Sequence, residues 1–149
     1  MAVASRRASR GAKRGGVPNA LFVLAAAELP PDELLSLAAE VTVTFPWGSL
    51  LAGALATDRA VAAGIASLLA PAGRVRILLS VIDDDRLSIP PLGESDAAGL
   101  AERWACHDLW LSSFRLATTD EIGGSGSSWA RRLAAGKLRP VWRFDLVRR

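Results

Sequence analysis

Residues 40–55, EVTVTFPWGSLLAGAL, are typical of a strand that runs directly into a rigid turn and then into a helix. The β-branched residues in 40–45 favour an extended strand, which Pro46 brings to an end. The proline ring fixes its own backbone and restricts Phe45, and Gly48 lets the chain turn into the helix. Trp47 is therefore predicted to be held at a defined place where a strand ends.

The segments that flank this unit alternate between strand and helix patterns. Upstream, residues 20–27 (ALFVLAAA) are a short apolar run typical of a strand buried on both faces, and the Pro-Pro pair that follows predicts a helix. Downstream, Asp58 is a plausible cap for a helix over residues 58–69, and residues 74–82 (RVRILLSVI) indicate a third strand. This order predicts a doubly wound α/β fold with a parallel sheet.

Predicted helices and strands also follow one another in the C-terminal half, but in a less regular order. The sequence predicts a helix over residues 96–108, a strand over 110–118, a flexible loop over 123–128 (GGSGSS), a short basic helix over 129–135 and a closing strand over 140–147. With 149 residues and no internal repeat, one domain over residues 1–149 is expected.

Composition excludes several classes of protein. Half of the residues are hydrophobic, and the mean hydropathy of +0.25 argues against a disordered chain. Every apolar run is interrupted before about 18 residues, so a soluble protein without a membrane partner is expected. A lone cysteine, Cys106, and a lone histidine, His107, exclude an internal disulfide and a Cys/His zinc cage, which favours a cytoplasmic setting.

Charge is strongly segregated along the chain. Residues 1–16 carry five cations and no acid, and residues 129–149 carry seven cations and one acid, so the two ends together sum to +11. Residues 17–128 carry six cations and fourteen acids, a sum of −8. This separation indicates a polyanionic partner, although two solvated basic tails would show the same pattern.

Ligands of doubly wound sheets bind at the carboxyl ends of the strands, which makes two segments notable. The small side chains of residues 25–27 would let a flat ligand approach the backbone, and the Glu28 carboxylate could accept a hydrogen bond from it. Trp47 is placed to stack on a planar ring such as a flipped nucleobase. The alternatives are that the alanines only permit helix packing and that Trp47 caps the end of the sheet from within the core.

A third candidate is the segment 125–139, SGSSWARRLAAGKLR, in which a Gly/Ser loop precedes Trp129 and a cluster of cations. An aromatic residue among cations is typical of nucleic-acid binding, but a surface helix with Trp129 packed inward fits too. The acidic run 83–85 is interpreted as a solvated turn and not as a Mg²⁺ site. Adjacent Cys106 and His107 would not face each other on a helix, which argues against a catalytic pair.

Three motifs together, NALFVLAAAELP, EVTVTFPWGSLL and SSWARRLAAGKLR, resemble the aminoglycoside-resistance 16S rRNA (adenine-N1) methyltransferases of the KamB/NpmA type, which modify adenine 1408 in the decoding site. The resemblance extends over nearly the whole chain. It implies a class I, Rossmann-like S-adenosylmethionine-dependent methyltransferase fold and a monomer that acts on 16S rRNA in the assembled 30S subunit without a metal ion.

The resemblance also implies roles for individual residues. Trp47 and Trp129 would stack on the flipped adenine, with Pro46 and Ser127 beside it. The residues expected to contact S-adenosylmethionine are Ala26, Ala27, Glu28, Thr44 and Ser49. Those expected to face the rRNA are Arg6, Arg7, Arg10, Lys13, Arg14, Arg132, Lys137 and Arg139.

One feature of the family is missing from this sequence. The family begins with a βαβ unit that carries a GxGxG loop, and no such segment precedes Ala20. The expectation is an N-terminally truncated domain whose sheet is divided and has open apolar edges. Two alternatives stay open at this point: a non-catalytic RNA-binding remnant, and a nucleotide-binding α/β domain that acts on a small molecule.

Overall fold

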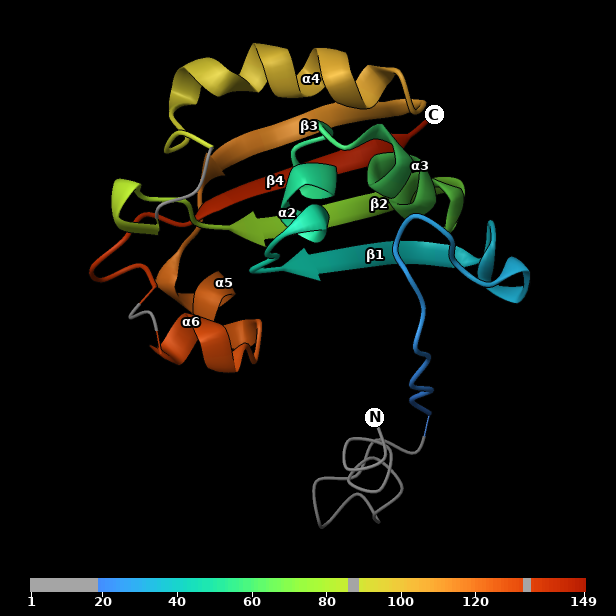
Figure 1. The fold of residues 1–149 in the computed structure, drawn as a ribbon, viewed down its shortest axis with the longest axis horizontal. Helices are drawn as coiled ribbons and strands as arrows, with labels where there is room; N and C mark the ends of the chain where they lie inside the picture. Colours follow the sequence, from blue (N-terminus) through green and yellow to red (C-terminus); the bar gives the residue numbers. More distant parts are fainter. Residues whose placement is uncertain (1–18, 86–88, 133–134) are drawn as a thin grey trace.

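The computed structural model describes residues 19–85, 89–132 and 135–149, and its centre is one four-stranded sheet (Figure 1). The predicted rRNA-facing residues Arg6, Arg7, Arg10, Lys13 and Arg14 lie outside the described residues. The strands are β1 (Ala38–Thr44), β2 (Leu69–Leu79), β3 (Leu109–Leu116) and β4 (Trp142–Arg148). The helices are α2 (Ser49–Ala54), α3 (Arg59–Ser67), α4 (Ala97–Ala105), α5 (Thr119–Gly124) and α6 (Ser128–Arg132), with 3₁₀ turns η2 (Asp32–Leu34), η3 (Asp83–Asp85) and η4 (Glu94–Asp96).

The sheet is mixed and has the order β1-β2-β4-β3. β1 pairs with β2 in parallel, with Val43 opposite Ile77, as expected for a strand–helix–strand crossover. β4 enters between β2 and β3 and is antiparallel to both. The parallel pairing predicted from the strand–helix–strand order is confirmed for β1 and β2, and β4 adds an antiparallel strand whose direction the sequence did not predict.

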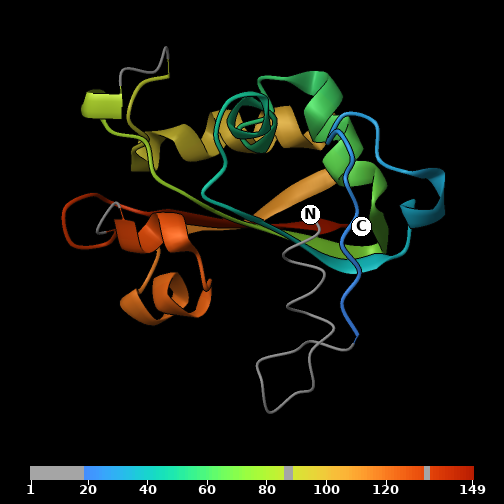
Figure 2. The same cartoon turned by 60° about the horizontal axis from the view of Figure 1, so that its bottom comes forward.

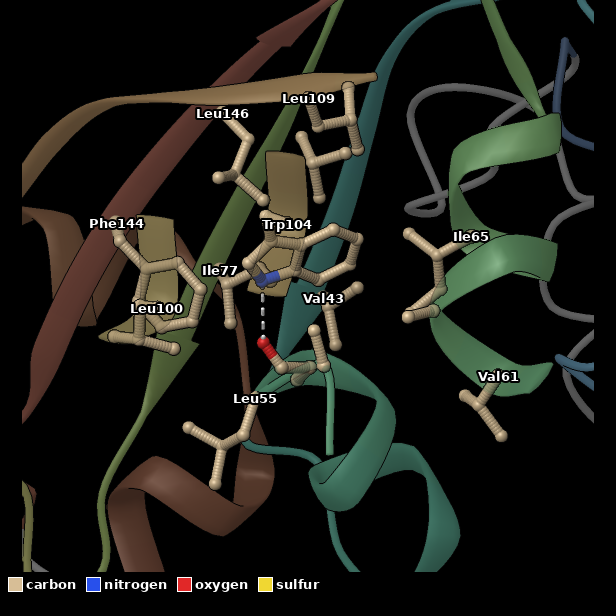
Figure 3. Close-up of a cluster of buried hydrophobic side chains, with 14 of the residues drawn as sticks. Val43, Leu55, Val61, Ile65, Ile77, Leu100, Trp104, Leu109, Phe144 and Leu146 are labelled. Carbon is tan, nitrogen blue, oxygen red and sulfur yellow. Dashed lines mark hydrogen bonds between the residues drawn. The ribbon is translucent and has the colours of Figure 1, made fainter. Parts of the chain in front are cut away.

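Side-chain alternation makes the two faces of the sheet chemically different. The apolar face carries Val43, Val75, Ile77, Leu79, Phe144 and Leu146, and it packs under α2, α3 and α4. Trp104 of α4 is fully buried in this core, and its indole Nε1–H donates to the carbonyl of Ala54 at 3.2 Å (Figure 3). Figure 2 shows α5 and α6 on the opposite face, near one end of the strands.

The helix ends confirm part of the sequence interpretation. The Asp58 carboxylate accepts hydrogen bonds from the backbone N–H groups of Ala60 and Val61, so Asp58 caps α3 as predicted. The prediction of a flexible loop over residues 123–128 was partly wrong. Thr118 and Glu121 form a capping box at the start of α5, and this helix includes Gly123 and Gly124. The helix predicted after the Pro-Pro pair is only the three-residue turn η2.

The strand predicted over residues 20–27 does not form. Leu21 is 81% exposed and Leu24 is 84% exposed, and in the described residues this stretch makes only an isolated bridge between Ala26 and Leu29. A strand buried on both faces needs a neighbouring strand, and the described sheet ends at β1. The expected divided sheet is therefore wrong for the described residues, whose strands form one continuous sheet with β1 at its edge.

Candidate functional site

The turn after β1 holds Trp47 at the surface by a constrained backbone. Phe45 is buried and has a φ of +49°, a left-handed conformation that is unusual for a bulky residue, and its N–H donates to the carbonyl of Leu78 at 2.7 Å. Pro46 is buried as well. Gly48, with a φ of +58°, then starts α2. Strained backbone of this kind is found at binding and catalytic sites, and here it leaves Trp47 38% exposed.

A second element, α6, carries Trp129 to the same place. The Ser127 hydroxyl accepts a hydrogen bond from the Ala130 backbone N–H at 3.3 Å, so Ser127 caps the start of this short helix. Ala130 turns inward and packs with Phe45 and Ile122 in a small second core. Because Ala130 faces inward, the adjacent Trp129 faces outward and is 45% exposed, which excludes the inward-packed alternative.

Trp47 and Trp129 are 82 positions apart in the sequence and are in contact in the structure. Their ring centroids lie 6.0 Å apart, and the ring planes are tilted by 33°. A base stacked between two rings requires about 7 Å, since one stacking step is about 3.4 Å. The two indoles therefore have the placement of a base clamp that must open by about 1 Å to accept its ligand.

Cations surround this pair unevenly. The guanidinium of Arg132 lies over the Trp129 ring, with its central carbon 5.4 Å from the ring centroid. Arg131 and Lys137 are exposed, and both line a pocket of about 360 Å³ between α5 and α6. Arg132 and Lys137 are thus both accessible to solvent, and their contact with rRNA stays a prediction.

Arg139 requires a correction. The sequence interpretation placed it toward the rRNA, but the residue is only 5% exposed and its guanidinium forms an ion pair with Asp85. Its Nε–H and Nη2–H groups also donate to the hydroxyl and the carbonyl of Ser80, at 2.8 and 3.1 Å. The prediction failed because sequence spacing does not show that η3 lies beside this arginine. Asp85, interpreted as part of a solvated turn, is instead its buried partner.

The polar face of the sheet contributes a charged network that the sequence did not reveal. Its members are Glu40, Arg74, Arg76, Arg115, Glu121, Arg143 and Asp145, joined by six ion pairs across all four strands and α5. The side-chain hydrogen bond from Arg115 holds the pKa of Glu121 well below its ordinary value, with a further contribution from the Thr118 backbone N–H. The hydrogen bonds that Arg143 donates to Asp145 raise the pKa of Arg143. The one sequence signal for this network is the alternation of charged and apolar side chains along the strands, which places the charged ones on the same face of the sheet.

A polar pocket of about 540 Å³ opens beside this network. It is lined by Thr42, Thr44, Arg76, Leu78, Glu121, Gly124, Ser125 and Arg143. Thr44 is one of the predicted cofactor residues, and Ser49 lies five positions further, at the start of α2. These two residues share the end of β1 with Trp47.

The other predicted cofactor residues, Ala26, Ala27 and Glu28, lie elsewhere. The Ala27 carbonyl packs so closely on α3 that a Cβ added to Gly64 would come within 1.9 Å of it. The end of α3 is joined to the chain just before β1, since the Ser36 N–H donates to the Ser67 carbonyl at 2.8 Å. In Figures 1 and 2 the segment that contains residues 26–28, drawn in blue, lies beside α3 and away from α5 and α6. The structure therefore brings Thr44 and Ser49 to the tryptophan pair and leaves residues 26–28 toward the other end of β1.

No group of three or more His, Cys, Asp and Glu side chains in residues 19–85, 89–132 and 135–149 could hold a metal ion. Within the part of the chain that the structure describes, no helix has both the length and the apolar character needed to cross a bilayer.

Comparison with known proteins shows the family to which the chain belongs. The family model for NpmA, a 16S rRNA (adenine(1408)-N(1))-methyltransferase, matches residues 1–147. The chain belongs to this family. Its similarity to the methyltransferases extends to an rRNA methyltransferase of Saccharopolyspora hirsuta, with 35% identity over 87% of this chain and 86% of the relative. A 16S rRNA (adenine(1408)-N(1))-methyltransferase of Streptoalloteichus tenebrarius is also 35% identical, over 97% of this chain and 67% of the relative.

Solved methyltransferase structures share the fold. A Trp-to-Ala variant of the 16S rRNA (adenine(1408)-N(1))-methyltransferase of Catenulisporales acidiphilia, determined with S-adenosylmethionine, superimposes with a TM-score of 0.83 at 29% identity. The 16S rRNA methyltransferase KamB superimposes with a TM-score of 0.82 at 31% identity. In both cases 99% of this chain is covered, together with 70% and 71% of the other chain. The α/β methyltransferase fold is therefore shown, over about seven-tenths of these relatives' length.

Proposed function

We propose that this protein transfers a methyl group from S-adenosylmethionine to N1 of adenine 1408 in 16S rRNA and so confers aminoglycoside resistance. The observation that carries the proposal is the surface pair of Trp47 and Trp129, which two distant segments bring to a ring separation of 6.0 Å. Membership in a family named for this reaction supports it.

The chain's own residues would act mainly by holding the base. A flipped adenine between the two indoles gains about 1–3 kcal/mol for each stacking contact. N1 of adenine is itself the nucleophile, so the protein need not supply a general base and must chiefly keep the base in line with the methyl donor. The left-handed Phe45 and the buried Pro46 serve this purpose because they restrict the backbone next to Trp47. Ser127 serves it by capping α6.

The residues at the end of β1 fit the cofactor. Thr44 has a side-chain hydroxyl beside a polar pocket of about 540 Å³, which is within the usual size range of small-molecule sites. We propose that Thr44 and Ser49 hold the end of S-adenosylmethionine that is close to the base, and that Ala26, Ala27 and Glu28 contact its adenosine end. When bound, the cofactor supplies an electrophilic methyl group on a sulfonium.

Binding to the ribosomal subunit is assigned to the cationic surface. Lys137 is exposed in the segment that follows α6, and the basic residues Arg6, Arg7, Arg10, Lys13 and Arg14 add to the positive charge of the chain. We propose that residues 1–149 act as a single methyltransferase domain and as a monomer on the assembled 30S subunit. A ribosomal substrate implies a cytoplasmic location, and the proposed reaction requires no metal ion.

One observation favours a second candidate function. Residues 26–28 lie beside α3, whereas Thr44 lies at the far end of β1, which spans about 20 Å at 3.3 Å per residue. If these two groups do not contact one cofactor, the protein would be a non-catalytic RNA-binding member of the family that retains the tryptophan pair. Calorimetric titration with S-adenosylmethionine separates the two functions, because only the methyltransferase requires cofactor binding.

The decisive experiment measures methyl transfer to 30S subunits from labelled S-adenosylmethionine. We expect Trp47→Ala and Trp129→Ala each to abolish labelling of the target adenine, because either change removes one face of the base clamp. Trp110→Ala is the matched control: Trp110 is similarly exposed, at 37%, but lies on β3 at the outer edge of the sheet. Undiminished labelling in either clamp variant would contradict the proposed role of the pair.

A further inference from the structure

Arg132 has two possible uses at this surface. As an exposed cation it could contact an RNA phosphate, or it could act on the indole that it covers. Its guanidinium carbon lies 5.4 Å from the centroid of the Trp129 ring, within the range of a cation–π contact. In the described residues no carboxylate forms an ion pair with Arg132, whereas Arg74, Arg76, Arg115, Arg139 and Arg143 are each paired with acids. The Trp129 ring is therefore a contact of the Arg132 guanidinium that no ion pair with a described carboxylate competes for.

The two residues belong to one helix. Trp129 and Arg132 are three positions apart on α6, a spacing that places side chains next to each other on the helix surface. Trp47 approaches Trp129 as well, with a ring separation of 6.0 Å. Trp129 is thus in contact both with Trp47 from the turn after β1 and with Arg132 of its own helix.

This arrangement has a consequence for base entry. The clamp must widen by about 1 Å to admit a base, and both segments that flank α6 contain a glycine in the left-handed region: Gly126 at φ +64° and Gly136 at φ +79°. If α6 shifts as a unit, Trp129 and Arg132 move together and their contact survives the opening. The base would then enter between the two indoles, with Arg132 as the outer layer behind Trp129.

We propose that Arg132 is a positioning residue that stacks behind Trp129 and sets the orientation of its indole for the target base. The inference rests on the proposed function for its purpose, because it assigns the base as the ligand of the pair. A positioning role and a phosphate contact predict different results. If Arg132 positions the ring, its loss should disorder the Trp129 indole and weaken base stacking without changing the number of phosphates that the protein neutralises.

The first test uses the free protein. Two indoles at this separation give a coupled circular-dichroism signal, which is isolated as the difference between wild type and Trp47→Phe. We expect Arg132→Met to lose most of this difference signal, and Arg132→Lys to retain part of it because the cation is kept. Arg149→Met is the matched control, since Arg149 covers the Trp110 ring at the same 5.4 Å on the far edge of the sheet and should leave the signal unchanged. An Arg132→Met signal identical to wild type would overturn the inference.

The second test measures binding to 30S subunits over a series of salt concentrations. The Arg132→Met variant should bind about two- to fivefold more weakly at every salt concentration, because it loses one exposed cation–π contact. The slope of log affinity against log salt should not change. Lys137→Met, the comparison for a phosphate contact, should lower that slope by about one. A slope lowered by about one in Arg132→Met would overturn the inference. If the wild type itself does not bind, the proposed function fails, while the dichroism of the free protein still decides whether Arg132 holds the ring.

Discussion

Replacing Asp85 by alanine should destabilise this protein severely, because it removes the ionic partner of a buried arginine. Arg139 is 5% exposed, and the side chain of Asp85 is 9% exposed. Asp85 accepts hydrogen bonds from two guanidinium nitrogens and, at 3.1 Å, from the Ile82 backbone N–H. After the substitution the guanidinium keeps only Ser80, so a nearly complete positive charge stays buried.

The expected cost follows from that burial. Removing one partner of a buried ion pair lowers the free energy of unfolding by about 3–5 kcal/mol, which is a large part of a total stability of about 5–15 kcal/mol. Urea unfolding monitored by tryptophan fluorescence measures this loss. Asp83→Ala is the control, because Asp83 is exposed in the same 3₁₀ turn and should change stability by about 0.5 kcal/mol at most. The double variant Asp85→Leu with Arg139→Met should recover most of the loss, since it removes both buried charges together.

A small effect would refute this reasoning. If Asp85→Ala costs less than about 1 kcal/mol, the range of solvent-exposed pairs, then Arg139 is accessible and could bind rRNA as the sequence predicted. A loss of salt dependence in 30S binding on substitution of Arg139, without a loss of stability, would support the same conclusion.

Three further predictions concern other parts of the molecule. Lys137→Met should weaken 30S binding and flatten its salt dependence by about one unit of slope, as titrations at several salt concentrations would show; an unchanged slope would mean that Lys137 faces only water. Because the pKa of Glu121 is lowered in the folded state, its stabilising effect is complete above the ordinary carboxyl pKa of about 4.3 and is lost as the pH falls below it. The urea midpoint should therefore fall less steeply with acid in Glu121→Gln than in wild type, and parallel curves would contradict this. Asp58→Ala should cost about 1 kcal/mol in urea unfolding through loss of the α3 cap, and an unchanged midpoint would argue against it.

Local chemistry accounts for the part of the fold that was predicted correctly. The alternating side chains of residues 40–45 require a strand with two unlike faces, and the proline and glycine that follow require a sharp turn before α2. Asp58 caps α3 for reasons that involve only the next three residues. The motif that contains Trp129 likewise places an aromatic residue among cations without any reference to the rest of the chain.

The failed predictions depended on contacts between distant segments. Residues 20–27 have the composition of a buried strand, but pairing requires a neighbouring strand, and in the described sheet β1 has only β2 beside it. The direction of β4 was not predicted at all, because it depends on where the chain re-enters the sheet, and the alternation of side chains does not encode this. Arg139 has the same composition and spacing as its cationic neighbours, yet η3 covers it because the folded chain brings Asp85 to it across 54 positions.

The sequence by itself determined the family, the strand–turn–helix unit around Trp47, and the separation of charge between the ends and the middle of the chain. Each of these is carried by neighbouring residues or by residue counts. The family resemblance already placed Trp47 and Trp129 at one base, and only the tertiary structure decided the 6.0 Å separation of their rings, the contact of Arg132 with Trp129, and the burial of Arg139. The physical reason is that burial and contact depend on the packing of segments far apart in the sequence, and no local pattern of residues specifies that packing.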